Sequence, residues 1–557
     1  MTGRLFREFS IVVSGSVIIS SFAALTFTPM LATKLLIKRE KQSWFYRKTE
    51  PFFEGMNRIY SRSLAAFLRK RWIALPFTAA TILIIGFLWN YIPAEMAPLE
   101  DRSQISINTR GAEGVTYEYI RDYTEDINLL VDSITPDAEA VTARVSSGSG
   151  NIRITLKDMQ DRDYTQMEVA EKLSKAVQKK TMARSFVQQS SSFGGRRGGM
   201  PVQYVLQATN IEKLQEVLPK FMAKVYENPV FQMADVDLKF SKPEARININ
   251  RDKASIMGVS TRNIAQTLQY GLSGQRMGYF YMNGKQYEIL GEINRQQRNK
   301  PADLKGIYIR SSQGDMVQLD NLIELTDGIA PPKLYRYNRF VSATISAGLA
   351  DGKTIGQGLD EMDKIAKETL DDTFRTALTG DSKEYRESSS SLMFAFILAI
   401  LLIYLILAAQ FESFKDPLII MLTVPLAIAG ALVFMYFGDI TMNIFSQIGI
   451  IMLIGLVAKN GILIVEFANQ KQEAGEDKMQ AIKDAALQRL RPILMTSAST
   501  VLGLIPLAFA TGEGCNQRIA MGTAVVGGML VSTLLTMYIV PAIYSYVSTN
   551  RSKLKNE

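Results

Sequence analysis

The sequence lacks histidine and has a single cysteine. Among its 557 residues there is no His, and Cys515 is the only Cys. Because a His metal site, a His general base and a Ser-His-Asp triad each need an imidazole, all three kinds of site are excluded. One cysteine cannot form a disulfide within the chain, a CxxC pair or a zinc knuckle. These absences exclude histidine and paired-cysteine metal sites, and we expect Cys515 to be an ordinary small residue.

The sequence also lacks the motifs of enzymes and of nucleotide binding. It contains no GxxxxGK[ST] phosphate cradle, and no nucleophile, metal cluster or acid pair stands out, so an enzyme is the weakest hypothesis. The formal charge of +9 could suggest nucleic acid. The segment QQSSSFGGRRGGM at 188–200 carries one short Arg-Gly pattern, which is better explained as a flexible loop than as a nucleic-acid arm. We expect no nucleic-acid partner.

Long apolar stretches are what the sequence has in abundance. Apolar residues make up 47% of the chain, and windows of about 20 of them are long enough to cross about 30 Å of hydrocarbon. The first run reaches Leu31 without a convincing cleavage site, which favours a spanning helix over a signal peptide. The sequence predicts seven transmembrane helices, two before a long polar region and five after it. Their windows lie near 10–33, 72–92, 390–409, 417–437, 445–468 and, holding two helices, 493–545.

The distribution of Lys and Arg predicts how these helices are oriented. The loop 34–71 holds eleven basic residues and three acids, so the positive-inside rule makes it cytoplasmic and places the polar region 93–389 on the outer side. The basic segment 470–491 agrees with this orientation. Arg4 and Arg7, which precede the first span on the outer side, disagree with it, but they are two charges against eleven. Because the loop 34–71 mixes aromatic and basic residues, we expect an amphipathic helix on the membrane surface, with a solvated loop as the alternative.

The long polar region alternates between strand-like and helix-like patterns. Repeated βαβ units with antiparallel pairs indicate small split-βαβ (ferredoxin-like) subdomains. The predicted fold class is therefore an α-helical polytopic membrane protein with a large α+β insert. The strand-like runs are 105–109, 152–156, 202–208, 245–249, 287–293, 307–310 and 341–347, and the helix-like runs are 113–132, 165–179, 211–227, 254–271 and 354–371.

One charge stands near the middle of an apolar run. Lys459 lies within Phe445–Gln470, and a Lys at the centre of a spanning helix costs about 2.5 to 3.5 kcal/mol on insertion scales. Such residues normally face a protein interior and pair with an acid. No Asp or Glu stands at mid-depth in any predicted span, and Glu466 is about 10 Å nearer the cytoplasm. We expect the partner of Lys459 on another segment or another chain.

Three further polar residues lie close to Lys459 in depth or in sequence. Asn460 could simply bond a neighbouring helix. Arg489 falls at the cytoplasmic start of the next predicted helix, where a snorkelling arginine is the plain alternative to a functional role. Thr496 lies deeper and could bond back to its own helix.

Five stretches then carry a resemblance to a known family. They resemble, in order and at the expected spacings, the resistance-nodulation-division efflux transporters, in particular the hydrophobe and amphiphile efflux branch. The resemblance covers essentially the whole chain but only the C-terminal half of a family protein, from what resembles its sixth transmembrane helix. The stretches are LTFTPML at 25–31, LAAQFESF at 407–414, PLIIMLTVPLAIAGAL at 417–432, GLVAKNGILIVEFAN at 455–469 and RLRPILMTS at 489–497.

The resemblance implies a multi-pass pump of the bacterial inner membrane with a large periplasmic domain. Such pumps export small amphiphilic compounds by proton antiport, are driven by the proton-motive force rather than a cofactor, and form homotrimers with a periplasmic adaptor and an outer-membrane channel. Lys459 matches the family's AKN lysine, which pairs with two aspartates of the half that this chain lacks. With Asn460 of the same motif, and with Arg489 and Thr496, it would form a proton relay. The acidic motif of the heavy-metal branch is absent, which disfavours a metal pump.

The resemblance also implies a division of the chain. Within the periplasmic region a docking insert at about 250–335 would interrupt two porter subdomains, 101–200 and 201–249 resuming at 336–384. The predicted parts are a transmembrane helix at 1–33, a cytoplasmic amphipathic helix at 34–71, a transmembrane helix at 72–92, the porter and docking region at 93–384, a five-helix transmembrane block at 385–547 and a cytoplasmic tail at 548–557.

The substrate cleft is the least specified part of this prediction. Family members that take aromatic drugs often line it with phenylalanines, but the segment Val145–Ile154 offers none. Phe186 and Phe193, which sit among Gln and Ser, are the candidate cleft residues. A second hypothesis stays open, namely a truncated or split membrane-anchored binding or assembly module without transport activity of its own.

Overall fold

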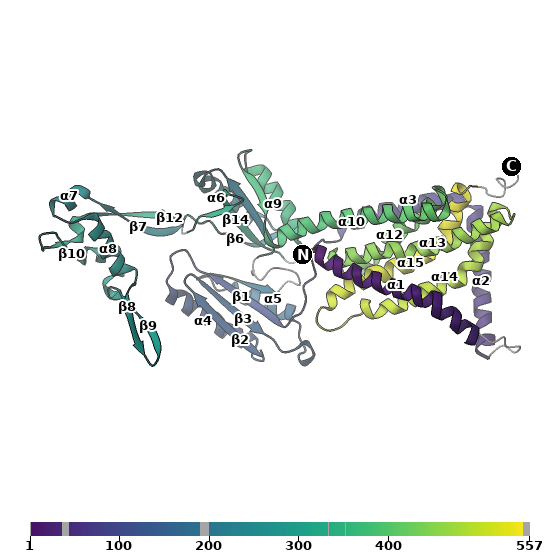
Figure 1. Cartoon of the computed structure of the whole chain (residues 1–557), viewed down its shortest axis with the longest axis horizontal. Coiled ribbons are helices and arrows are strands. Elements are labelled where there is room, and N and C mark those ends of the chain that lie inside the picture. Colours follow the sequence, from purple (N-terminus) through teal and green to yellow (C-terminus); the bar gives the residue numbers. More distant parts are fainter. Residues whose placement is uncertain (1, 36–43, 190–199, 332, 351, 550–557) are drawn as a thin grey trace.

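The molecule is long, with a helical block at one end and mixed α/β parts extending from it (Figure 1). The computed structural model describes residues 2–35, 44–189, 200–331, 333–350 and 352–549. Two α/β subdomains lie next to the helical block, and a separate lobe lies at the far end of the molecule (Figure 1). The predicted tail 548–557 and the predicted loop 188–200 fall largely outside the described residues.

Seven helical stretches of the described residues are long and apolar enough to cross a membrane. They lie at the places where the apolar windows predict them. The sequence reason is the same for each, because a run of about 20 apolar residues satisfies its backbone internally as a helix in hydrocarbon. The stretches are Arg7–Lys34, Arg71–Tyr91, Gly380–Phe411, Lys415–Phe437, Ile444–Glu473, Lys478–Ala508 and Cys515–Val547.

Several helices extend beyond the predicted windows, and two differences affect the argument. The stretch predicted at 417–437 is two helices with a break at Leu422, and the last-but-one helix begins at Lys478, well before the predicted window at 493. Arg489 therefore lies three turns inside a helix rather than at its start. The helices are α1 (Thr2–Leu35), α2 (Trp44–Arg69), α3 (Ala74–Tyr91), α10 (Gly380–Phe411), α11 (Lys415–Met421), α12 (Thr423–Phe437), α13 (Ile444–Glu473), α14 (Lys478–Ala508) and α15 (Cys515–Val547).

Helix α13 has well-defined ends. The Asn443 side chain accepts hydrogen bonds from the backbone N–H groups of Phe445 and Ser446, at 3.0 and 3.1 Å, and the Ser446 hydroxyl accepts one from the N–H of Asn443 at 2.8 Å. This reciprocal capping box fixes where the helix starts. At the other end Gly475 takes a positive φ of 100°, which favours glycine just after a helix.

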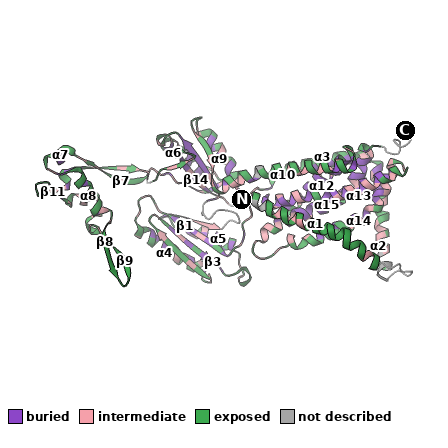
Figure 2. Ribbon diagram, viewed as in Figure 1, coloured by how far each residue is buried: buried purple, intermediate pink, exposed green. Residues whose placement is uncertain are grey.

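Helices α12, α13 and α15 form the centre of the block. A Cβ added to Gly528 of α15 would clash with the side chain of Leu453 and lie 2.9 Å from the carbonyl oxygen of Ala427, so close helix packing requires a glycine there. Helices α1 and α10 are instead largely exposed along their apolar length (Figure 2). Their surfaces need an apolar environment outside the described residues.

Helix α2 covers part of the loop predicted to be amphipathic. It buries Tyr60 and Leu64 against the block while Phe52 and Ile59 on its other side are 70% and 71% exposed. The Tyr60 hydroxyl donates a hydrogen bond of 2.6 Å to the carbonyl oxygen of Met537 in α15. One face of α2 therefore packs on the helices and the other is free to face lipid head groups.

The first soluble subdomain is a four-stranded antiparallel sheet with two helices on one face. Its strands have the order β2-β3-β1-β4, and the isoleucines at 105, 107, 152 and 154 form its core with α4 and α5. Along the chain the elements are β1 (Gln104–Arg110), α4 (Tyr117–Ile134), β2 (Ala140–Ser146), β3 (Ser149–Thr155), α5 (Gln166–Val177) and β4 (Arg184–Gln189).

The second soluble subdomain repeats this arrangement. Its core strands have the equivalent order β6-β14-β5-β15, with the short β13 beside β14. Strand β5 and helix α6 have the bounds predicted from the sequence. The elements are β5 (Val202–Ala208), α6 (Ile211–Glu227), β6 (Phe231–Val236), β13 (Tyr335–Tyr337), β14 (Phe340–Leu349), α9 (Ile355–Thr369) and β15 (Arg375–Leu378).

The distal lobe is inserted between β6 and β13. Strands β7 (Lys242–Ile249) and β12 (Ile323–Ala330) pair antiparallel along their full length and form the ribbon that carries it. This ribbon connects the lobe to the second subdomain (Figure 1). The lobe contains α7 (Arg251–Ile256), α8 (Thr261–Leu272), the hairpin β8 (Gln275–Met282) and β9 (Lys285–Gly291), and the short pair β10 (Tyr308–Arg310) and β11 (Met316–Gln318).

Candidate functional site

Lys459 lies near the middle of α13 and is half-buried. Its Nζ donates a hydrogen bond of 3.4 Å to the hydroxyl of Thr500 in α14. Among the described residues no Asp or Glu lies within ion-pair distance of this ammonium group. A long bond to a neutral hydroxyl offsets little of the cost of placing an ammonium group at this depth.

The buried carboxylate of Asp416, in α11, lies far from Lys459. Asp416 at the start of α11 is 2% exposed, and its Oδ2 accepts a hydrogen bond of 3.1 Å from the amide of Asn469. Asn469 in turn accepts one from the hydroxyl of Tyr544 at 2.5 Å. Because Asn469 is ten residues beyond Lys459 on α13, the two are about 15 Å apart along the axis. Asp416 is therefore no partner for the lysine.

Asn460 lies at the junction of three helices and is fully buried. Its Nδ2 donates hydrogen bonds of 3.3 Å to the hydroxyls of Ser497 in α14 and Thr533 in α15. Those two hydroxyls are 3.1 Å apart and also bond each other. Asn460 thus ties α13 to both neighbouring helices, while its Oδ1 is buried without a partner among the described residues.

Among the described residues, the other two predicted relay residues form no hydrogen bond with Lys459. The Arg489 guanidinium carbon lies 4.5 Å from the centre of the Phe467 ring, and its buried Nε has no partner among the described residues. Arg489 precedes Thr500 by eleven residues on α14, an axial separation of about 16 Å. The Thr496 hydroxyl is exposed and bonds back to the carbonyl oxygen of Ile493 at 3.1 Å.

Sequence reasoning missed the hydroxyl residues around Lys459 and Asn460. Ser497, Thr500 and Thr533 each bond one of the two side chains. The signal for two of them was the polar spacing within SASTV, because residues three apart share a helix face. Thr533 shares the same spacing with Thr536, but the sequence does not link it to Asn460, because the two are 73 residues apart and on different helices.

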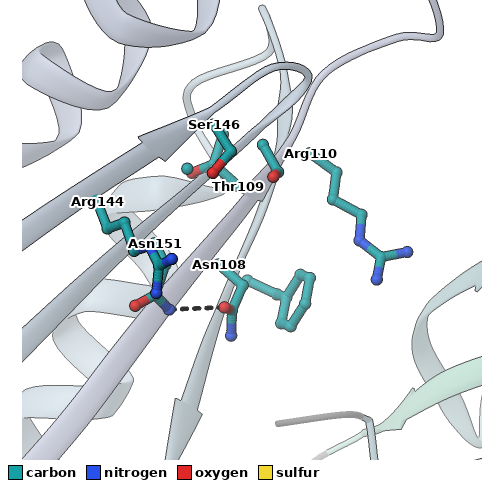
Figure 3. A pocket seen from close by; sticks show the side chains of 9 residues that line it. Asn108, Thr109, Arg110, Arg144, Ser146 and Asn151 are labelled. Atoms are coloured by element: carbon teal, nitrogen blue, oxygen red, sulfur yellow. Dashed lines mark hydrogen bonds between the residues drawn. The ribbon is translucent and has the colours of Figure 1, made fainter. Parts of the chain in front are cut away.

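The candidate cleft residue Phe186 lines a pocket on the first subdomain. The pocket has a volume of about 210 Å³, and much of its lining comes from the segment Val145–Ile154 and from Asn108 to Arg110 of β1. Most of the lining side chains are polar (Figure 3). Phe186 and this segment, which the sequence links only by the family resemblance, therefore share one pocket. Phe193 lies outside the described residues.

Comparison with known proteins gives the chain its family. A profile described as the AcrB/AcrD/AcrF family matches residues 1–548. A protein of Haemophilus influenzae described as an uncharacterized transporter is 31% identical over 566 residues, an alignment that covers all of this chain and 55% of the relative. The chain thus spans about half the length of that curated relative. Because the family profile matches nearly every residue, the chain belongs to the AcrB/AcrD/AcrF family, whose relative here is a transporter.

Proposed function

We propose that this chain is the C-terminal half of a proton-driven pump that exports amphiphilic compounds across the bacterial inner membrane by drug:proton antiport. Its support is the family match together with the environment of Lys459. An ammonium group at the middle of a spanning helix is costly and usually marks a proton or ion route. In a pump the cost is offset when carboxylates bring their negative charge to the lysine.

The single observation that carries the proposal is the lack of a carboxylate beside Lys459 among the described residues. We propose that the partner aspartates belong to the N-terminal half of the transporter. When they are ionised, Lys459 pairs with them, and when protons neutralise them the lysine loses that attraction. Proton uptake would thereby change which contacts α13 makes.

The polar cluster around Asn460 suits the transmission of that change. Its hydrogen bonds reach Ser497 of α14 and Thr533 of α15, so a shift of α13 acts on both helices together. Arg489, stacked on Phe467, and Thr496, one turn before Thr500, would serve as further relay groups from α14. We propose this relay as the coupling element of the pump.

The proposed assembly follows from the same family. The two subdomains of equivalent strand order would be split-βαβ porter units, and the lobe on the β7–β12 ribbon a docking unit. Together with the N-terminal half the chain would form a homotrimer that joins a periplasmic adaptor and an outer-membrane channel. The exposed apolar lengths of α1 and α10 would contact lipid or that other half.

Dye accumulation tests this function in cells that produce both halves. We expect Lys459→Ala to raise intracellular dye to the level of cells without the pump, at an unchanged amount of membrane-inserted protein. The matched control is Lys471→Ala, which removes a lysine at the end of the same helix where it pairs with Glu476 at 2.6 Å. Unchanged efflux in the Lys459 variant would refute the relay.

A membrane-anchored binding or assembly module is the second candidate. It is favoured for the chain by itself because Lys459 has no carboxylate partner in the described part of the chain. The two candidates differ in what a second half does. If the chain pumps dye only when the N-terminal half is supplied, it is half of a pump. If supplying that half changes nothing, the binding module is the better description.

A further inference from the structure

The sheet of the first subdomain has two different faces. Alternate residues of β1 and β3, among them Ile107 and Ile152, are fully buried beneath α4 and α5. The side chains between them point to the opposite face, because successive residues of a strand alternate. No helix of the subdomain covers that open face, and the pocket lined by Phe186 lies on it.

The strand register places four open-face residues in one row across the sheet. Arg144 of β2 is opposite Asn151 of β3, Asn151 is opposite Asn108 of β1, and Asn108 is opposite Phe186 of β4. The amide of Asn151 donates a hydrogen bond of 2.7 Å to the Oδ1 of Asn108, and Arg144 lies beside Asn151 (Figure 3). The row therefore runs from a cation, through amides, to an aromatic ring.

The open face carries positive charge and no negative charge. Its strand residues include four arginines, and none is an Asp or Glu. Arg153 is diagonal to Arg144 in the register, and in ordinary sheet geometry the Cα atoms of such diagonal residues are about 7 to 8 Å apart. The four arginines are Arg110, Arg144, Arg153 and Arg184.

Among the described residues, two of these arginines form ion pairs and two do not. Arg110 and Arg184 lie 2.9 and 3.7 Å from the carboxylate of Asp235 in the second subdomain. Arg144 and Arg153 are exposed and have no ion pair among the described residues. Charged residues on an edge strand often have the simple role of preventing that strand from pairing with another sheet. That explanation fits β2 but not Arg153, which lies on the interior strand β3.

We infer that this face binds the anionic head group of an amphiphile, with Arg144 and Arg153 holding the carboxylate or sulfonate and the Phe186 ring packing against the apolar part. Guanidinium groups form paired hydrogen bonds with such anions, and an aromatic ring supplies the apolar contact. The inference rests on the proposed export of amphiphiles, and it names their charge. Arg144 and Phe186 line the pocket, and Arg153 lies on the same open face outside its lining. This face then selects acids over neutral or cationic compounds of the same shape.

Binding to the purified full chain in a neutral detergent tests the inference without a proton gradient. The probes are dansyl acid, a naphthalene sulfonate, and dansylamide, its uncharged analogue with the same ring system. We expect dansyl acid to bind more tightly, and Arg144→Gln or Arg153→Gln to weaken it about tenfold each while dansylamide is unaffected. Phe186→Ala should weaken both probes alike.

Two controls keep the test decisive. Arg121→Gln removes an exposed arginine of α4, on the other side of the sheet, and should change neither probe. Arg144→Lys keeps the charge and should retain most of the preference for the acid. Equal binding of the two probes to the native chain would overturn the inference. Unchanged binding of dansyl acid in the glutamine variants would also overturn it, and this is the result expected if the arginines instead face an acidic protein segment.

This result is separable from the pump itself. Lys459→Ala should leave the binding of dansyl acid unchanged, because Lys459 is in α13 and the pocket is in the first soluble subdomain. If the native chain binds dansyl acid and dansylamide equally well while dye efflux depends on Lys459, only the inference is contradicted. Intact selectivity with efflux that is insensitive to Lys459 would contradict only the proposed function.

Discussion

Two cations of the same chain, Arg162 and Lys459, are held in opposite ways. The Arg162 side chain is fully buried in the first soluble subdomain and pairs with Asp101, while it also donates hydrogen bonds to the carbonyl oxygens of Tyr164 and Lys157 at 2.7 and 3.0 Å. Asp101 accepts a further hydrogen bond from the N–H of Gln166 at 2.8 Å. Among the residues that the structure describes, Lys459 has one hydrogen bond, of 3.4 Å to Thr500.

The two cations differ in whether their own part of the molecule supplies a carboxylate partner. A buried charge is tolerated when its partners satisfy it, and Arg162 finds all of them within one subdomain. Lys459 finds no carboxylate among the described residues, so its partner must come from elsewhere if it is to be neutralised. The first soluble subdomain therefore satisfies its buried cation with its own residues, whereas the described part of the helical block offers Lys459 a hydroxyl group and no carboxylate.

The largest expected effect is the loss of stability when Arg162 is substituted. Arg162→Ala leaves Asp101, whose side chain is 12% exposed, without its cation, and we expect the opening free energy of strand β1 to fall by about 3 kcal/mol. Hydrogen exchange of the β1 amides in the full chain measures it. Arg121→Ala, which breaks the exposed pair with Asp122, should cost less than about 1 kcal/mol. Similar small losses in both variants would remove the contrast between the two cations.

The opposite sign is expected for Lys459 when the chain is studied alone. Lys459→Met removes a cation whose insertion costs about 2.5 to 3.5 kcal/mol and which has no carboxylate to lose. Thermal unfolding in detergent should therefore show equal or higher stability, although we expect the same variant to inactivate the proposed pump. A clear loss of stability would mean that Lys459 already has a strong partner in this chain.

A smaller effect is expected beside Lys459, at Asn460. Removing its amide by Asn460→Ala breaks the hydrogen bonds to Ser497 and Thr533. A double-mutant cycle with Ser497→Ala should give a coupling of about 0.6 kcal/mol, and no more than about 1.7 kcal/mol. A cycle with Thr496→Ala serves as the control, since Thr496 bonds only its own helix, and it should show no coupling.

The smallest effect concerns an exposed contact between the first subdomain and the distal lobe. Arg295 donates hydrogen bonds of 2.6 and 3.0 Å to the carboxylate of Glu118, and this contact, helped by the backbone at the start of α4, lowers the pKa of Glu118 from 4.5 to about 2. Because the folded pKa is below the unfolded one, the contribution of this contact to stability is fully present above pH 4.5 and is lost as the pH falls towards about 2.

Spin-label distances between α4 and the lobe report on this contact. The distance distribution should stay narrow from neutral pH down to the lowered pKa, and Glu118→Gln should broaden it at every pH. Glu125→Gln, on the same helix and exposed, is the control and should leave the distribution unchanged. A distribution that broadens at pH 4.5 in the native chain would show that the pKa is not lowered.

The sequence predicts elements well where one local property decides them. Hydropathy locates the seven long apolar helices, and strand β5 and helix α6 have the predicted bounds because their apolar periodicity is strong. Strand β2, AVTARVS, is absent from the prediction, since it is an edge strand with an open and largely polar side. Strand β4 is missed for a similar reason, because RSFVQQ is half polar.

The site is predicted only as far as single residues carry it. Lys459 and Asn460 are conspicuous because they are polar in an apolar run, and Phe186 is found in the pocket. The bonds to Ser497 and Thr533 depend on how α14 and α15 pack against α13, which no local pattern encodes. The arginine row likewise depends on the register of four strands, so it becomes visible only in the folded sheet.

Proton movement into proteoliposomes is the most direct measurement of the central claim. Vesicles that contain the chain together with the N-terminal half, and that enclose a pH-sensitive dye, are given an amphiphilic substrate and a proton gradient. The account predicts substrate-dependent proton flux with the native chain and none with Lys459→Ala, while Lys471→Ala keeps the flux. Equal proton flux in the native and Lys459→Ala vesicles would contradict the role of Lys459 as the basic arm of a proton relay.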